Sequence, residues 1–102
     1  MNKVSFALVE NIQSEKKLIN LLNSLLKKKE NIIIDFNEKI EVKPSTISLL
    51  KEFELKFEQI DKSFILVSAN NKLQKWADVV IPTIKEAQDY LEMEEIQRQL
   101  KF

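Results

Sequence analysis

The sequence has 102 residues, of which 44% are hydrophobic and 31% charged, the ordinary composition of one globular domain. Sixteen Lys and Arg residues balance sixteen Asp and Glu residues, so no net charge attracts nucleic acid or an anionic membrane. The absence of Cys, His and Gly excludes disulfides, thiol and imidazole catalysis, and glycine-rich phosphate loops. We therefore expect a single cytoplasmic domain over residues 1–102 that is not an enzyme and has no cofactor and no metal.

The first part of the chain predicts a strand, a helix and a second strand. Residues 3–9 alternate loosely between apolar and polar side chains, as in a half-buried strand. Ser14 is a preferred N-cap for the helix that follows. Residues 31–36 form a continuous, isoleucine-rich run, typical of a parallel strand buried on both faces. Between these two predicted strands, the leucines that recur at helical spacing are Leu18, Leu21, Leu22 and Leu25.

The rest of the chain predicts two more strands and two longer helices. A helix is expected to begin near Ser45, followed by a second buried run at residues 63–68 and a short helical segment at residues 73–77. A third apolar run, residues 79–81, leads to a capping box at Thr83-Ile84-Lys85-Glu86, which starts the last helix. The inner side of that helix is predicted to carry Ile84, Ala87, Leu91 and Leu100, with Tyr90 and Ile96 beside them.

Strands that alternate with helices predict parallel pairing through right-handed crossovers. The expected fold class is therefore α/β, with a sheet of four mainly parallel strands and helices packed on it. The strand order that we expect is 2-1-3-4.

Ser45 is the most informative candidate site residue. It follows Pro44 where the second long helix is expected to begin, and Ser is a preferred N-cap. The same position suits a phosphate, because backbone N–H groups and the helix dipole would interact favourably with the added charge. A plain cap and a phosphoacceptor are both open, and the plain cap needs nothing beyond local structure.

Four other features each have a structural and a functional interpretation. Asp35 ends a buried run at the edge where open α/β sheets bind ligands, but a lone carboxylate more simply caps the next loop. Lys27–Lys29 would contact RNA or would complement the dipole at a helix end. Trp76 would anchor an interface or pack on the sheet edge. Glu94 and Arg98 have the i,i+4 spacing of an ion pair, on an acidic helix that would bind a partner or remain solvated.

The order of elements and two local patterns resemble the STAS domain, the fold of the anti-sigma factor antagonists. Residues 31–36 (NIIIDF) are similar to the family's strand that leads to a loop and an Asp-Ser-Ser-Gly motif at the start of a helix. Residues 80–87 are similar to the family's last strand and its T-x-x-E-A helix start. The motif positions hold Lys43, Pro44, Ser45 and Thr46, so only Ser45 keeps the family's residue, the serine that a kinase phosphorylates.

The resemblance runs from about residue 3 to residue 91, with the family's usual first strand missing or shortened. The longer tail, residues 91–98, looks like a group of short bacterial STAS-type proteins, some of which carry the name ribonuclease Z. That enzyme builds its zinc site mainly from His, which this sequence lacks. The resemblance therefore implies an accessory role beside such an enzyme and no ribonuclease activity of the chain itself.

Together, these observations predict a non-catalytic regulatory module that docks a protein partner through the loop and helix around Ser45, through the C-terminal helix, or through both. The expected partner is a kinase or anti-sigma-like protein or ribonuclease Z. Two alternatives remain open: an accessory to an RNA-processing enzyme, and a small ligand- or nucleotide-binding domain that uses the Asp35 loop. We expect no membrane or nucleic-acid partner, and the oligomeric state stays open. Ser45 is the candidate phosphoacceptor, and the predicted partner-binding residues are Lys43, Thr46, Trp76 and Glu94.

Overall fold

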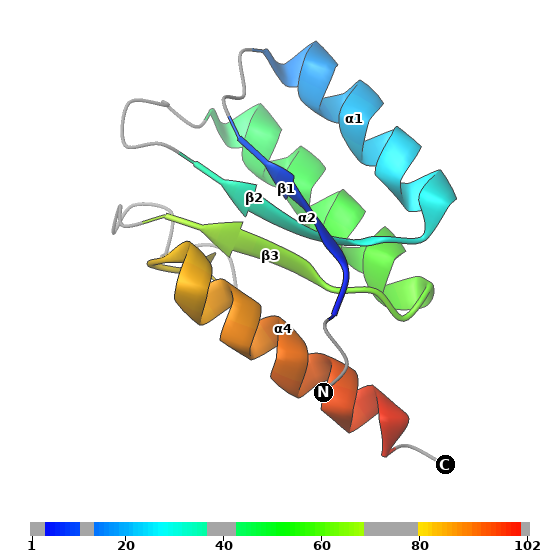
Figure 1. The fold of residues 1–102 in the computed structure, drawn as a ribbon. Helices are drawn as coiled ribbons and strands as arrows, with labels where there is room; N and C mark the ends of the chain where they lie inside the picture. The colour runs from blue at the N-terminus through cyan, green and yellow to red at the C-terminus, as the bar shows by residue number, and fades with distance from the viewer. Residues whose placement is uncertain (1–3, 11–13, 37–42, 69–79, 101–102) are drawn as a thin grey trace.

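A computed structural model of the chain describes residues 4–10, 14–36, 43–68 and 80–100. These residues form a parallel sheet with helices on both faces (Figure 1). The predicted α/β fold of four parallel strands with helices packed on the sheet is confirmed. The predicted short helix at 73–77, together with Trp76, lies outside the described residues. In chain order the elements are β1 (Phe6–Val9), α1 (Glu15–Lys28), β2 (Asn31–Asp35), α2 (Pro44–Gln59), β3 (Phe64–Val67), β4 (Val80–Ile81) and α4 (Ile84–Gln99).

The strand order is β1-β2-β3-β4, so the predicted order 2-1-3-4 is wrong. β1 lies at an edge of the described sheet and is only partly buried, with Leu8 40% exposed, whereas β2 and β3 are buried along nearly their whole length. Right-handed crossovers that advance in one direction place successive helices on the same face. α1 and α2 do lie on one face (Figure 1). The order 2-1-3-4 would have placed these two helices on opposite faces.

Alternate strand residues supply two separate cores, one on each face of the sheet. Ile34 belongs to the core beneath α1 and α2, whereas its neighbour Ile33 belongs to the core beneath α4. Ile33 pairs in register with Ile65, and Leu66 pairs with Val80. Because helices cover both faces, residues 31–34 are all buried, which explains the continuous apolar run in the sequence.

The helix ends form without glycine. Ser14 is the N-cap of α1, as predicted, and its side chain accepts a hydrogen bond of 3.2 Å from the Lys17 N–H. Thr83 caps α4 in the same way through the Glu86 N–H, at 3.2 Å. The left-handed backbone positions after α1 and α2 fall on Lys29 and Asp61, with φ of 54° and 57°.

The predicted inner side of the last helix is wrong at its C-terminal end. Ala87 and Leu91 are buried against the sheet, but Ile96 and Leu100 are exposed. At about 100° per residue, the nine positions from Leu91 to Leu100 rotate the side chain to the opposite face of the helix. None of the helices in the described segments has the length and apolar character needed to span a bilayer.

Candidate docking surface

α1 and α2 begin at the carboxyl edge of the sheet (Figure 1). Their first turns are in contact through side chains. The Ser45 hydroxyl and the Thr46 hydroxyl each donate a hydrogen bond to Oε2 of Glu15, both at 3.4 Å. Ser45 is exposed, whereas Thr46 and Glu15 are half-buried. One carboxylate oxygen therefore links the starts of two helices through two long hydrogen bonds.

Ser45 is not the N-cap of α2, and that prediction is corrected. The N-cap is Lys43, which has an extended backbone with φ −76° and ψ 153°. Pro44 occupies the first helical turn, where a missing N–H breaks no hydrogen bond and a fixed φ suits the helix. Pro44 thus starts the helix before Ser45, and the Ser45 hydroxyl contacts a neighbouring helix instead of capping its own.

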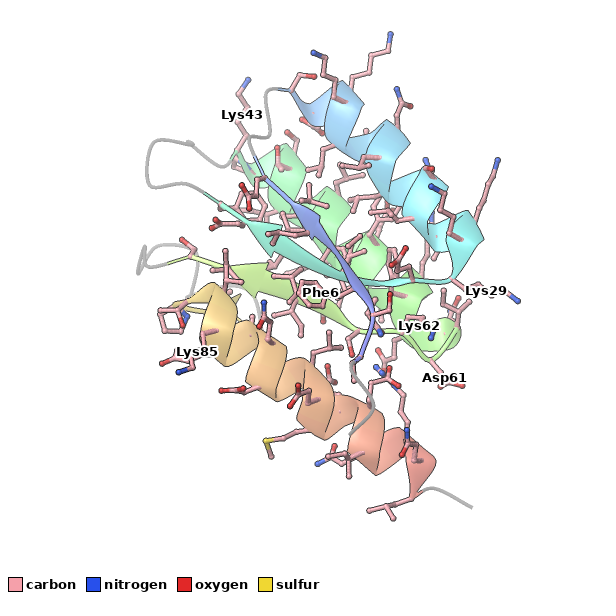
Figure 2. All side chains as sticks on the ribbon, in the orientation of Figure 1. Phe6, Lys29, Lys43, Asp61, Lys62 and Lys85 are labelled. Atoms are coloured by element: carbon pink, nitrogen blue, oxygen red, sulfur yellow. The ribbon has the colours of Figure 1, made fainter. Side chains whose placement is uncertain are left out.

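Lys43 is an unusual residue for the position that it occupies. N-caps are mostly Ser, Thr, Asp or Asn, because their side chains accept hydrogen bonds from the first turn. The Lys43 side chain makes no such bond, and no acidic residue lies in the first turn of α2. Figure 2 shows this side chain extending away from the body of the protein. The start of α2 therefore presents an exposed cation beside an exposed hydroxyl.

Asp35 lies at the same edge of the sheet, at the end of β2, and is half-buried. The following residue, Phe36, continues the sheet by donating its N–H to the Val67 carbonyl at 2.9 Å. The loop proposed to work with Asp35, residues 37–42, lies outside the described residues. Within the described segments, no group of three or more carboxylates is placed to hold a metal ion.

The opposite, amino edge of the sheet carries an open pocket of about 370 Å³ between the end of α2 and the second half of α4. Glu54, Glu94 and Tyr90 line it. Burial, and then the negative charges of Glu94 and Glu54, raise the pKa of the Tyr90 hydroxyl.

The ion pair predicted between Glu94 and Arg98 is replaced in the structure by one between Arg98 and Glu95, at 2.5 Å. Arg98 points inward there, because its second nitrogen donates to the Ser63 hydroxyl at 2.7 Å.

The predicted site residues thus divide into two places. Lys43, Ser45 and Thr46 lie together at the carboxyl edge, whereas Glu94 lies toward the amino edge. Lys27–Lys29 end α1 far from Lys43, as the labelled Lys29 shows in Figure 2. Sequence reasoning missed Glu15, because its role depends on a contact between helices thirty residues apart in the chain.

Comparisons with known proteins add no assignment to this geometry. No protein-family model matches the sequence, and no curated protein sequence matches it significantly. The function has to be inferred from the chain's own residues.

Proposed function

We propose that this chain is a regulatory protein-binding module of the STAS type that works by docking a partner and not by catalysis. Its docking surface is the start of α2, with Lys43, Ser45 and Thr46 at the centre and Glu15 of α1 beside them. The observation that carries the proposal is the exposed Ser45 hydroxyl in contact with Glu15, at the junction of two helix starts. The resemblance of the sequence to anti-sigma factor antagonists favours a kinase or an anti-sigma-like protein as the partner.

Lys43 supports this assignment, because it is a poor choice for the stability of the chain alone. Its side chain does not cap α2, and its positive charge opposes the helix dipole at that end. Natural proteins tend to depart from such local rules at functional sites. An exposed lysine at this position is explained by a contact with an acidic or polar group of a partner.

The contact between Ser45 and Glu15 gives the surface a means of regulation. A phosphate on Ser45 would add roughly −1.5 to −2 charge at neutral pH. It would also remove the hydroxyl hydrogen through which Ser45 now donates a hydrogen bond to Glu15. The added charge would repel the Glu15 carboxylate and attract Lys43, which lies two residues earlier in the chain. Phosphorylation of Ser45 would therefore rearrange the docking surface while both cores of the sheet stay intact.

Quantitative affinity capture from extracts of the native cell tests the proposal. The baits are the wild-type chain, Ser45→Asp and Ser24→Asp; Ser24 is an exposed serine on α1 and serves as the matched control. We expect one protein that the wild type and Ser24→Asp retain equally and that Ser45→Asp retains at least fivefold less. A bound set that is the same for all three folded baits would refute the proposal. Circular dichroism of each bait confirms that its helices are intact.

A further inference from the structure

The second half of α4 carries an apolar stripe on the side that faces away from the sheet. Met93, Ile96 and Leu100 are 60%, 55% and 66% exposed. They follow the i, i+3, i+7 spacing of one helix face, opposite the face where Ala87 and Leu91 are buried. Figure 1 shows that the C-terminal end of α4 projects beyond the sheet. This helix is thus apolar on two opposite sides, and the outer side has no cover among the described residues.

Acidic side chains surround the N-terminal end of the stripe. Asp89 continues the line of the stripe one turn before Met93, and Glu86 and Glu92 lie on its two flanks; all three are exposed. Lys85 is also exposed on this side and offsets one of the three negative charges. The outer face of α4 therefore combines an acidic first half with an apolar second half.

We propose that this outer face inserts into an apolar groove of a partner protein whose rim carries lysine and arginine side chains. The i, i+3, i+7 anchors are the pattern by which amphipathic helices bind such grooves, and the acidic residues specify the charge of the rim. A second copy of the chain fits poorly. A symmetric contact of this face with its own copy would set its acidic residues against the same acidic residues and would supply no basic rim.

The stripe is held ready for this contact by the rest of the fold. On the inner side of the same turns, Arg98 bonds to Ser63 and Glu95. These contacts fix the rotation of the helix, so that the three apolar side chains face outward before a partner binds. The inference does not depend on the Ser45 surface, because the stripe lies toward the other edge of the sheet.

Photocrosslinking in the native cell tests the proposal directly. The photoreactive residue p-benzoylphenylalanine is placed in the full chain at position 93, at position 100, or at position 24 on α1 as the control. We expect one protein to be cross-linked from positions 93 and 100 and not from position 24, through an apolar segment with Lys or Arg nearby. A cross-link between two copies of the chain, or the same products at position 24, would overturn the proposal.

Binding measured with the purified partner then tests the chemistry. Ile96→Asp should weaken the complex at least tenfold, and the double variant Asp89→Lys, Glu92→Lys should weaken it several-fold while leaving the stripe unchanged. Added salt should weaken the wild-type complex and have less effect on the double variant. If neither the substitutions nor added salt changed the affinity for the purified partner, the proposed binding of the stripe in an apolar groove would be refuted. Co-sedimentation of the wild type with vesicles of phosphatidylcholine and 30% phosphatidylglycerol, lost in Ile96→Asp, would instead identify a membrane as the occupant and would refute it too.

Discussion

Asn31 and Ser63 join two neighbouring strands at the amino edge of the sheet. Oδ1 of Asn31 accepts a hydrogen bond of 2.9 Å from the Ser63 N–H, while Nδ2 of Asn31 donates to the Ser5 carbonyl at 3.0 Å. One buried side chain therefore connects β2 to the segments that lead into β1 and β3. The Ser63 hydroxyl extends the same network to Arg98 of α4. The hydrogen bonds of Asn31 and Ser63 stabilise the fold at the amino edge of the sheet, whereas Ser45 lies at the carboxyl edge.

Asn31→Ala should lower the free energy of unfolding by about 1–3 kcal/mol, because it leaves the buried Ser63 N–H without its acceptor. Urea unfolding followed by circular dichroism measures the loss. Asn23→Ala is the matched control, since Asn23 is exposed on α1, and its effect should stay within about 0.5 kcal/mol. Equal losses in the two variants would show that the Asn31 network does not stabilise the fold.

Lys43→Ser should raise the stability of the chain and weaken binding to its partner. A serine at this N-cap supplies the missing hydrogen bond and removes a cation from the positive end of α2, a gain of about 0.5–1 kcal/mol. Thermal unfolding measures the first effect, and retention of the captured partner measures the second. A variant that is more stable and binds as well as the wild type would remove Lys43 from the docking surface.

Ser45→Asp should destabilise the chain more when Glu15 is present than when it is replaced by Gln. The new carboxylate comes close to Glu15, where two charges about 4 Å apart repel by about 1 kcal/mol in water. A double-mutant cycle of Ser45→Asp and Glu15→Gln, measured by urea unfolding at low salt, should give a coupling of roughly 0.5–1 kcal/mol. A coupling of zero at low salt would mean that charge at position 45 does not act on Glu15.

Tyr90→Phe should reduce the loss of stability at alkaline pH. The pKa of Tyr90 is raised in the folded chain by burial and by Glu94 and Glu54, so folding favours the neutral phenol. This contribution is complete below the ordinary tyrosine pKa of about 10 and disappears as the pH rises through the folded value. The wild type should therefore lose more stability than the variant between about pH 9 and pH 12. Urea unfolding at each pH measures this loss. If the free energies of unfolding of the two proteins fell equally with rising pH, the prediction would be contradicted.

The sequence was a good guide to the elements, because each leaves a local pattern. The buried isoleucine run of β2, the Ser14 cap and the Thr83 cap all depend on residues within one or two turns, and all three are confirmed. The strand order is predicted incorrectly, because β1 lies at an edge of the sheet although its four residues are as apolar as those of the buried strand β3. The direction in which the crossovers advance is a property of the whole sheet and not of any single segment.

The candidate site was only partly predictable. The sequence brings Lys43, Ser45 and Thr46 together, because they are neighbours in the chain. It does not identify the N-cap, because Pro44 is already the first residue of the helix and Ser45 lies one position inside it. Glu15 could not be found, since a contact between two helix starts leaves no local pattern. The outward stripe of α4 could have been found from the rotation between Leu91 and Leu100 alone.

Hydrogen–deuterium exchange tests the docking surface most directly. The exchange of the chain is compared with and without the purified protein that wild-type capture retains and Ser45→Asp does not. We predict protection of the first turns of α1 and α2, around Glu15 and Ser45, with the β2 and β3 core unchanged. Protection confined to the second half of α4 would support the groove partner but contradict the proposed function. The absence of protection at both helix starts would contradict the claim that Ser45 and its neighbours bind the partner.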